Sequence, residues 1–417
     1  MLERGRSLAA LEDKRLEGHP RWRRYAPVAI AALLAAWLAT ERGGAFVGSS
    51  RAATPLTSSP DAAAPAGSPA RPPLLLVAGS SLTGYAPSPD LWAELAADAV
   101  PLADTLPFLF PPGAEASSET LSLGDPVFSH PLPGPLAELR PPARAGEPVY
   151  AATRAGLVRF DPTQPKRPPE LLLPGWDLAS LAVLGDGTVL LLERNYGEDL
   201  RTAVPAPLLA WRPETTQAPE TLAVCTAGAT RLLVAPGDSV VWVTRLFGRT
   251  IDRIARREGA WEKREVAVVP RVWNEDRFDL RIGFTPYGND VLLLDQGRGM
   301  RPRLLAIDAS GGTRPLYTWA RGLRTTNAAF APQESLLVLN GITNLSLLRL
   351  GPSGEWSYST GSTVTSTGLT ADGRWIALAA LDPAGERTAI HLRCRGSARL
   401  ASARLRDVIS AMYFLPS

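Results

Sequence analysis

The sequence is poor in the residues that most often build metal and nucleophilic sites. Its 417 residues include only three histidines, His19, His130 and His391, and only two cysteines. Zinc and copper sites take most of their ligands from these two residue types. The three histidines are far apart in the sequence, so we expect no transition-metal site and no bound cofactor.

Lysine is scarce as well, since only Lys14, Lys166 and Lys263 occur among 44 basic residues. The formal net charge is +3, and the first 24 residues carry it, because they hold seven basic and four acidic side chains. A nucleic-acid-binding domain would show a long basic stripe along one face. No such stripe follows residue 24, so we expect no nucleic-acid partner.

An uncharged stretch over residues 25–40 directly follows the basic segment. As a helix it would extend about 24 Å at ~1.5 Å per residue, somewhat short of a hydrocarbon core of about 30 Å. Aromatic side chains at both ends suit the membrane interfaces, and flanking arginines can reach the headgroups. We predict a single transmembrane helix with these anchors: Trp22, Arg23, Arg24, Tyr25 and Trp37.

The basic residues before this helix predict its orientation. The positive-inside rule places residues 1–24 in the cytoplasm and everything after the helix outside, in the periplasm of a bacterial inner membrane. A cleaved signal peptide is the alternative, but its charged region would be unusually long and no clean A-x-A cleavage site follows. An uncleaved anchor therefore fits the sequence better.

Residues 41–145 are rich in proline and read as a tether. The part up to residue 73 is Gly, Ala, Ser and Pro with few large apolar residues, as in extended linkers. In residues 74–145 one stretch, "LLLVAGSSL", resembles a lone strand, and "SPDLWAELAADAV" resembles a helix with Ser88 or Asp90 near its N-cap. Prolines are too frequent for regular structure, whereas Leu, Phe and Trp are too frequent for a free linker. We expect this segment to lie against the next domain or a partner.

The rest of the chain repeats one pattern: an apolar strand, a tight polar turn and a second apolar strand. Five copies occur, at residues 178–194, 229–245, 280–296, 326–341 and 367–382. A third and often a fourth strand follow most copies. Four short antiparallel strands every 40–50 residues are typical of a β-propeller blade.

The two ends of this region complete each other. Residues 145–162 supply a second and a third strand without a first, and the apolar run 408–417 is a first strand without a second. We therefore expect the last strand to pair with residues 148–153 and close the ring, which removes an open sheet edge. The residues expected at this closure are Ile409, Met412, Phe414, Val149 and Tyr150.

The chain thus resembles six-bladed β-propellers over residues 146–417, and the predicted fold class is all-β. The resemblance holds for architecture and not for one family. The marks of WD40, sialidase and kelch propellers are missing from the sequence.

Several residues are candidates for chemistry, and for most of them a structural role is the simpler interpretation. The carboxylates at first-to-second-strand turns suit turn chemistry, and a calcium site made of carboxylates alone remains the alternative; they are Asp186, Asp238, Asp290 and Asp372. The stretch "VAGSSLTG" at 77–84 departs from G-x-S-x-G and has no evident base. His391 lies in a third strand, away from the axis.

Two further groups complete the candidates. Four arginines are close in sequence and could bind a carboxylate or phosphate, although a solvated loop is the simpler alternative; they are Arg281, Arg298, Arg301 and Arg303. Cys225 and Cys394 fall on blades with another blade between them, too far apart for a disulfide. We expect both cysteines to be buried as small apolar residues.

Three functions are compatible with these patterns. The favoured one is a non-catalytic scaffold or accessory subunit, anchored by one helix, whose periplasmic propeller docks on a larger integral membrane complex. An envelope sensor or ligand-binding propeller and an enzyme acting at the centre of the ring are the alternatives.

The layout of cytoplasmic tail, single span, irregular tether and propeller also resembles the single-span propeller subunit of bacterial photosynthetic reaction-centre and light-harvesting complexes. That resemblance implies that pigments belong to neighbouring subunits, and the predicted span has no histidine to ligate one.

Overall fold

The computed structural model describes residues 73–415 apart from several internal stretches. The stretches outside the described part are 100–119, 143, 196–202, 216, 246–249, 268–278, 286–289, 296–300, 320–324, 326, 341–343, 351–353, 360–362, 383–384, 386 and 398. In the described part, no helix is long and apolar enough to cross a membrane. The predicted cytoplasmic tail, the predicted helix 25–40 and all five of its anchor residues lie outside the described residues, so they remain predictions.

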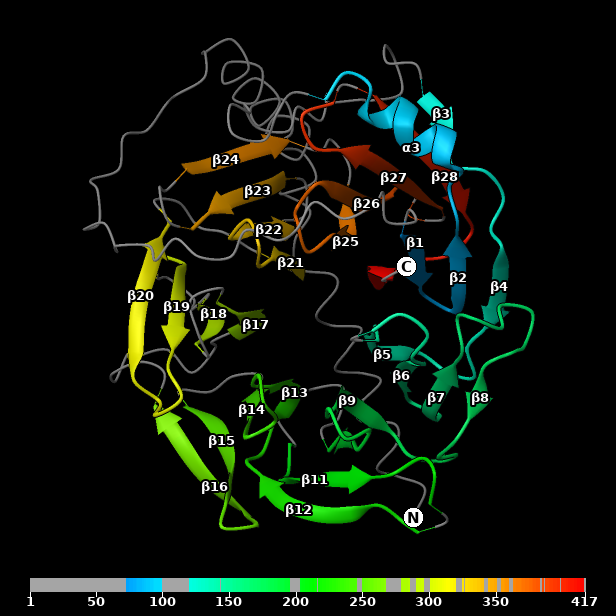
Figure 1. Ribbon diagram of the computed structural model, residues 1–417. Coiled ribbons are helices and arrows are strands. Elements are labelled where there is room, and N and C mark those ends of the chain that lie inside the picture. The colour runs from blue at the N-terminus through cyan, green and yellow to red at the C-terminus, as the bar shows by residue number, and fades with distance from the viewer. Residues whose placement is uncertain are drawn as a thin grey trace, which may run out of the picture. The chain divides into compact units, whose positions relative to one another are not determined.

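The strands of the described chain form seven sheets, which are antiparallel apart from one short parallel pairing (Figure 1). We number the sheets as blades 1–7 and give the strands of each blade from the inner to the outer one. Blade 1 contains β29 (Ala411–Leu415), β1 (Leu74–Ala78), β2 (Ser81–Tyr85) and β4 (Phe128–Pro131). Blade 2 contains β5 (Leu136–Arg140), β6 (Val149–Thr153), β7 (Gly156–Phe160) and β8 (Glu170–Leu171). Blade 3 contains β9 (Leu178–Val183), β10 (Val189–Glu193), β11 (Ala206–Trp211) and β12 (Glu220–Cys225).

The remaining four blades follow in chain order. Blade 4 contains β13 (Ala229–Val234), β14 (Val240–Arg245), β15 (Thr250–Arg257) and β16 (Ala260–Ala267). Blade 5 contains β17 (Asp279–Phe284), β18 (Val291–Asp295), β19 (Arg303–Ile307) and β20 (Thr313–Thr318). Blade 6 contains β21 (Asn327–Ala331), β22 (Leu336–Asn340), β23 (Asn344–Arg349) and β24 (Gly354–Ser359). Blade 7 contains β25 (Val364–Leu369), β26 (Trp375–Leu381), β27 (Thr388–Cys394), β28 (Leu400–Leu405) and, in parallel, β3 (Thr120–Ser122).

Apolar side chains join each blade to the next, and blade 7 to blade 1, so the sheets form a closed ring. Successive residues of a strand point to opposite faces. In β1, Leu75 and Val77 therefore pack on blade 7, whereas Leu76 and Ala78 pack on blade 2. A strand buried on both faces needs an unbroken apolar run, which is why the second strands read "LLLVA", "VLLLE" and "LLVLN".

The ring has seven blades, and the sequence-based count of six is wrong. Part of the segment interpreted as a tether forms blade 1, because "LLLVAGSSL" is a hairpin of β1 and β2 rather than a lone strand. The charged stretch "LAELR" at 136–140 forms β5, the inner strand of blade 2. The propeller therefore begins near residue 74 and not at residue 146.

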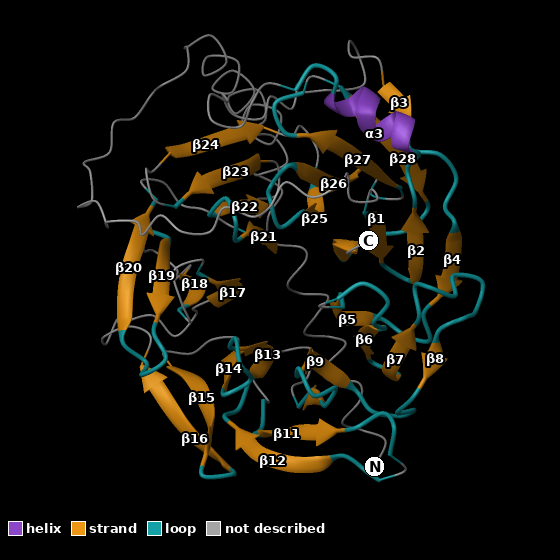
Figure 2. Cartoon of the chain, viewed as in Figure 1, coloured by secondary structure: helices purple, strands orange, loops and turns teal. Residues whose placement is uncertain are grey.

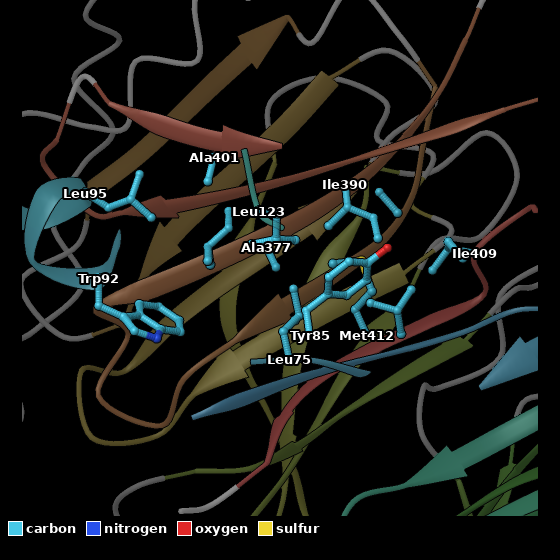
Figure 3. Close-up of a cluster of buried hydrophobic side chains, with 13 residues drawn as sticks. Leu75, Tyr85, Trp92, Leu95, Leu123, Ala377, Ile390, Ala401, Ile409 and Met412 are labelled. Carbon is cyan, nitrogen blue, oxygen red and sulfur yellow. The ribbon is translucent and has the colours of Figure 1, made fainter. Parts of the chain in front are cut away.

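The last strand closes the ring as expected, but its partner differs from the prediction. β29 pairs antiparallel with β1, with Met412 opposite Val77 and Phe414 opposite Leu75. Val149 and Tyr150 cannot take this role, because β6 already lies between β5 and β7. The closure belongs to blade 1, and Ile409 packs in the same apolar cluster as Met412 (Figure 3).

The chain just before β29 is fixed to the β1–β2 turn. The carboxylate Oδ2 of Asp407 accepts hydrogen bonds from the backbone N–H groups of Ser80, at 2.7 Å, and Ser81, at 3.2 Å. A Cβ added to Gly79 would lie 2.4 Å from the carbonyl oxygen of Val408. Only glycine allows this approach, so a polar contact and a steric requirement both hold the closing strand in place.

An insertion between β2 and β4, residues 86–127, reaches from blade 1 onto the outer part of blade 7. It contains α3 (Pro89–Ala96), the helix shown in purple in Figure 2. Of the two N-cap candidates in the sequence, Ser88 takes this position and accepts a hydrogen bond from the Leu91 N–H at 3.2 Å. Trp92 packs edge-on against Trp375 of blade 7, with ring centroids 4.3 Å apart. The insertion then adds β3 to the outer edge of β28.

Candidate functional site

Five of the seven inner strands contain one extra residue relative to their partners. In the pairings of β5, β9, β13, β17 and β25 with their second strands, the register shifts by one; the extra residues are Ala137, Ala179, Thr230, Ile282 and Thr365. A bulge of this kind bends the strand and changes the direction of the next side chain. The inner strands therefore share a local distortion that the second and third strands lack at those positions.

Polar side chains follow these bulges. Glu138, Ser180, Arg231 and Ser366 come directly after the extra residue on four inner strands. Glu138, Ser180 and Ser366 are buried, whereas Arg231 is exposed. Buried polar groups require hydrogen-bond partners, and here these partners come from neighbouring blades.

Arg140 makes the farthest-reaching of these contacts. Its Nε donates to the carbonyl of Leu181 at 3.0 Å, and its Nη2 donates to the carbonyl of Leu232 at 2.7 Å. Nη2 also lies 3.0 Å from Oε1 of Glu138 on the same strand. Since Leu181 belongs to blade 3 and Leu232 to blade 4, one side chain of blade 2 ties three successive inner strands together. To reach blade 4 it must pass on the axial side of β9.

The environment of Arg140 combines burial with access to solvent. Burial lowers the pKa of Arg140, and its proximity to Tyr413 of β29 opposes that shift. Nevertheless 23% of the side chain is exposed. Since it contacts three successive inner strands and still meets solvent, Arg140 lies on the axial side of these strands.

Ser180 is the hydroxyl next to this arginine. It is fully buried, donates to Oε2 of Glu138 and accepts the N–H of Leu232 at 2.9 Å. Both the proton and a lone pair of the hydroxyl are thus engaged. The arrangement is suited to holding the inner edge of β13, and the hydroxyl proton is directed to Glu138, whose other oxygen pairs with Arg140.

A second polar group joins blades 6 and 7. Thr367 Oγ1 lies 2.5 Å from Oδ1 of Asn340, and Asn327 Nδ2 donates to Ser366 Oγ at 3.3 Å. Asn327 also accepts the N–H of Ala328 through its side-chain oxygen. Side chains near the axis therefore bind neighbouring inner strands at two places in the ring.

Comparison with known proteins supports the fold and no more than the fold. No protein-family model matches the sequence, and no curated protein matches it. A solved 6-phosphogluconolactonase candidate from Bacteroides uniformis is 14% identical with a TM-score of 0.56, covering 83% of this chain and all of that one. A functionally unknown protein from Desulfotomaculum acetoxidans is 10% identical with a TM-score of 0.53, covering 80% of this chain and 99% of that one.

The chain is a β-propeller. A β-propeller domain from Myceliophteria thermophila Cps50 is also similar, at 13% identity and a TM-score of 0.48 over 66% of this chain and 87% of that one. At such identities the likeness transfers no activity to this propeller.

The turn aspartates lie at the first-to-second-strand turns, as predicted. Asp186 accepts the Thr188 N–H and pairs with Arg212, and Asp290 pairs with Arg314 of β20 at 3.0 Å. Hydrogen bonds from Thr188, backbone first, hold the pKa of Asp186 below its usual value. Asp238 accepts the Gly185 N–H of blade 3 at 2.6 Å. These contacts fit the turn-chemistry interpretation, and among the described residues no three His, Cys, Asp or Glu side chains are grouped as metal ligands.

Asp372 completes the set of turn aspartates. Its Oδ1 accepts the Arg374 N–H at 3.0 Å and the Thr370 hydroxyl at 2.5 Å, both within its own turn. The four turn aspartates thus have partners in turns or on strands, as turn chemistry requires.

The histidines are on different blades. His130 lies on β4, where Nε2 is 2.8 Å from the Pro165 carbonyl and the ring packs near Phe128 and Phe160. His391 lies on β27, the third strand of blade 7, as the sequence predicts. His19 is outside the described residues.

The stretch "VAGSSLTG" and the four candidate arginines do not form a common site in the described part of the chain. "VAGSSLTG" forms the β1–β2 hairpin, whose Ser80 and Ser81 contact Asp407. Arg303 pairs at 2.8 Å with Asp295, whose side chain is only 2% exposed. Arg301 is exposed, Arg281 lies on β17, and Arg298 is outside the described residues. No common site for the four arginines is evident among those described.

Both cysteines are free and buried, which confirms the sequence-based interpretation. Burial, helped by nearby Asp252, raises the pKa of Cys225 to about 12. A thiol with so high a pKa is not a nucleophile at neutral pH.

Three residues that contact one another across the inner strands were not predicted from the sequence: Glu138, Arg140 and Ser180. Glu138 and Arg140 were assigned to a tether, and nothing local marks Ser180. The available signal was the alternation in "PLAELR" just before the strand pair at 149–160.

Proposed function

We propose that this chain is a non-catalytic, membrane-anchored accessory or scaffold subunit whose propeller, on the outer side of the membrane, docks on a larger membrane complex. The proposal rests on the contacts of the polar side chains on the axial side of the inner strands. Ser180, Glu138 and Arg140 hold inner strands of neighbouring blades, and none of them is set up as a nucleophile with a free base. Polar side chains that hold neighbouring strands together make the propeller rigid, and a rigid propeller is suited to docking other proteins.

The membrane part of the proposal rests on the sequence. Seven basic residues precede the uncharged stretch 25–40, and the propeller follows after residue 73. The narrower idea, a subunit of a photosynthetic reaction-centre and light-harvesting complex, rests on layout alone. That layout included a long irregular tether, and much of the segment expected to form it belongs to the propeller instead. We therefore state the proposal for membrane complexes in general.

An experiment on the native membrane tests this. The full chain, tagged at the N-terminus because the C-terminal strand lies inside blade 1, would be extracted in mild detergent and run on a native gel. We expect it in a complex with integral membrane proteins in fixed ratio. Leu34→Arg is the matched control, because a central arginine costs about 2.5–3.5 kcal/mol of insertion free energy and leaves the propeller untouched. Migration of the unaltered chain as a monomer would contradict the proposal.

Protease treatment of spheroplasts tests the orientation separately. We expect the propeller to be digested, or to be cut in its exposed loops, while the N-terminal tag is protected. A protected propeller would show that the orientation is reversed.

A ligand-binding propeller is the second candidate function. It is favoured by one observation, the solvent-exposed part of Arg140 on the axial side of the inner strands.

A further inference from the structure

The insertion between β2 and β4, residues 86–127, is not needed to close the ring. Gly84 pairs with Phe128, and the Val127 N–H donates to the Gly84 carbonyl at 2.8 Å. The two strands are thus already adjacent where the insertion leaves and returns, and a tight turn could join them. Blade 1 has four strands without the insertion, and blade 7 has four without β3. The insertion is therefore an addition to a complete propeller.

The insertion and the part of blade 7 that it contacts carry opposite charges. Residues 86–127 include seven acidic side chains and no basic one. The hairpin of β27 and β28, from Thr388 to Leu405, includes no acidic residue and four arginines; they are Arg393, Arg395, Arg399 and Arg404. Complementary charge of this kind orients two surfaces and selects between partners.

Two acids of the insertion contact that hairpin. Glu94 Oε1 lies 3.4 Å from Arg399 Nη1, and Asp98 accepts a hydrogen bond from the Ser397 hydroxyl. Asp98 is also close to Arg393, whose side chain is buried. Burial lowers the pKa of Arg393 to about 10, and the charge of Asp98 opposes that shift. A buried arginine requires a nearby opposite charge, and the insertion supplies one.

Apolar and backbone contacts complete the attachment. Trp92, Leu95 and Leu123 of the insertion pack in one cluster with Ala401 of β28 (Figure 3). β3 pairs with β28 in parallel over three residues, and the Leu123 N–H donates to the Ser402 carbonyl at 2.9 Å. The outer edge of β28 thus accepts an added strand, as open sheet edges do in peptide recognition.

We propose that the outer edge of β28 is a docking site for an acidic extended segment of a partner protein, and that the insertion occupies this site in cis as an autoinhibitory contact. The cis occupant defines the chemistry of the partner segment: carboxylates for the arginines, large apolar side chains for the cluster around Ala401, and a backbone that pairs with β28. Because the insertion is an addition to a complete ring, it can leave the site while blade 1 stays closed. The proposal does not depend on the membrane docking proposed above, since the site and its cis occupant belong to one chain.

Hydrogen exchange of the full chain tests whether the insertion detaches by itself. In Asp98→Asn, the Leu123 N–H should exchange about tenfold faster than in the unaltered chain, because a local opening needs less free energy than global unfolding. The N–H groups of β1 and β29 should exchange at unchanged rates. Equal acceleration at β1 and β29 would overturn the proposal, because the insertion would then be inseparable from the ring.

Binding in trans tests the site itself. A fluorescently labelled synthetic peptide of residues 86–127 would be titrated against the full chain and against Asp98→Asn. The cis occupant competes at an effective concentration on the order of millimolar, so we expect Asp98→Asn to bind the peptide about tenfold more tightly than the unaltered chain. Asp90→Asn is the matched control, because it removes an exposed acid of α3 that makes no hydrogen bond or ion pair in the described part of the chain. It should bind the peptide as weakly as the unaltered chain.

A peptide in which all seven acids are replaced by their amides tests the ligand chemistry. We expect it to bind Asp98→Asn about tenfold more weakly than the acidic peptide, because it lacks the complementary charge. If Asp98→Asn does not fold, Glu94→Gln takes its place, since that side chain is 45% exposed. The proposal is overturned if the acidic peptide does not bind the loosened variant, if the amide peptide binds equally well, or if Asp90→Asn increases binding as much as the loosened variant does.

Discussion

Two strand pairings join the beginning of the propeller chain to its end, one at the inner edge of blade 1 and one at the outer edge of blade 7. At the inner end β29 pairs antiparallel with β1 over five residues, and Met412 and Leu415 are almost completely buried. At the outer end β3 pairs parallel with β28 over three residues, and Thr120 and Ser122 are exposed. Both pairings join segments that are far apart in the sequence.

The difference lies in what each pairing buries. β29 contributes to two apolar clusters, since Met412 packs toward blade 7 and Leu415 toward blade 2. β3 contributes Leu121 at the margin of one cluster, and Leu123 just after it. The inner closure should therefore contribute more to the stability of the ring than the outer closure, which fixes the insertion to blade 7.

Removing the inner closure should have the largest effect. Deletion of residues 408–417 removes an inner strand, and each large apolar side chain lost from the core costs about 1.5–3 kcal/mol. The sum is a large part of the ~5–15 kcal/mol that stabilises a domain. We expect the truncated chain to be insoluble on expression. A soluble truncated chain with an unchanged melting temperature would show that β29 does not close the ring.

A single side chain in the closing strand should have the next largest effect. Met412→Ala leaves a cavity between blades 1 and 7 and should lower the free energy of unfolding by about 2–5 kcal/mol in urea titrations. Met412→Leu, which conserves volume, is the control and should cost less than about 1.5 kcal/mol. A decrease in the free energy of unfolding of less than about 1 kcal/mol for Met412→Ala would mean that blades 1 and 7 are not tightly packed around Met412.

The outer closure can be tested through its backbone. The N–H of Leu123 donates to the carbonyl of Ser402 at 2.9 Å. Leu123→Pro removes both this donor and the side chain, whereas Leu123→Ala removes the side chain alone. We expect the two variants to differ by about 1 kcal/mol in the free energy of unfolding, the usual net value of one hydrogen bond. A difference as large as the Met412→Ala effect would give the outer closure equal importance.

The contact between blades 3 and 4, unlike the closure at blade 1, should depend on pH through one carboxylate, Glu265. Between blades 3 and 4, Glu265 accepts hydrogen bonds from Thr226 and Thr250, and that from Thr226, foremost, lowers its pKa below the ordinary 4.5. The ionised carboxylate therefore stabilises the fold above that value, and its contribution is lost as the pH falls through the lower pKa of the folded state.

We expect Glu265→Gln to flatten the fall of melting temperature between about pH 5 and pH 3 by a small amount, because the side chain is half exposed. Exposed Glu258→Gln is the control. Equal slopes for both variants would show that Glu265 does not make this seam sensitive to acid.

The repeat pattern explains how much of this fold could be predicted. Blades 3–7 each begin with an inner strand and a second strand that are adjacent in the sequence, so their periodicity shows the blade directly. Blade 1 has its inner strand at the far end of the chain and its outer strand after a long insertion. No local pattern records such a pairing, which is why blade 1 was missed although the closing role of the last strand was recognised.

The candidate site was harder to predict for a related reason. Leu181 and Leu232 lie 41 and 92 residues after Arg140 in the sequence, and the three meet only because successive inner strands are neighbours. In the sequence, Ser180 does not differ from any other serine in a strand, because its partners are known only from the structure. Turn aspartates, whose partners lie mostly nearby, were recognised from sequence alone.

Blade 1 combines strands from both ends of the propeller chain, so it cannot be completed until the end of synthesis. β1 leaves the ribosome about 330 residues before β29, which corresponds to roughly 20 to 70 s at ~5–20 residues per second. For that time Leu74–Ala78 has an unpaired apolar edge, the kind of surface that promotes aggregation. The nascent chain must either be shielded by a chaperone or export factor, or keep β1 unfolded until its last residues arrive.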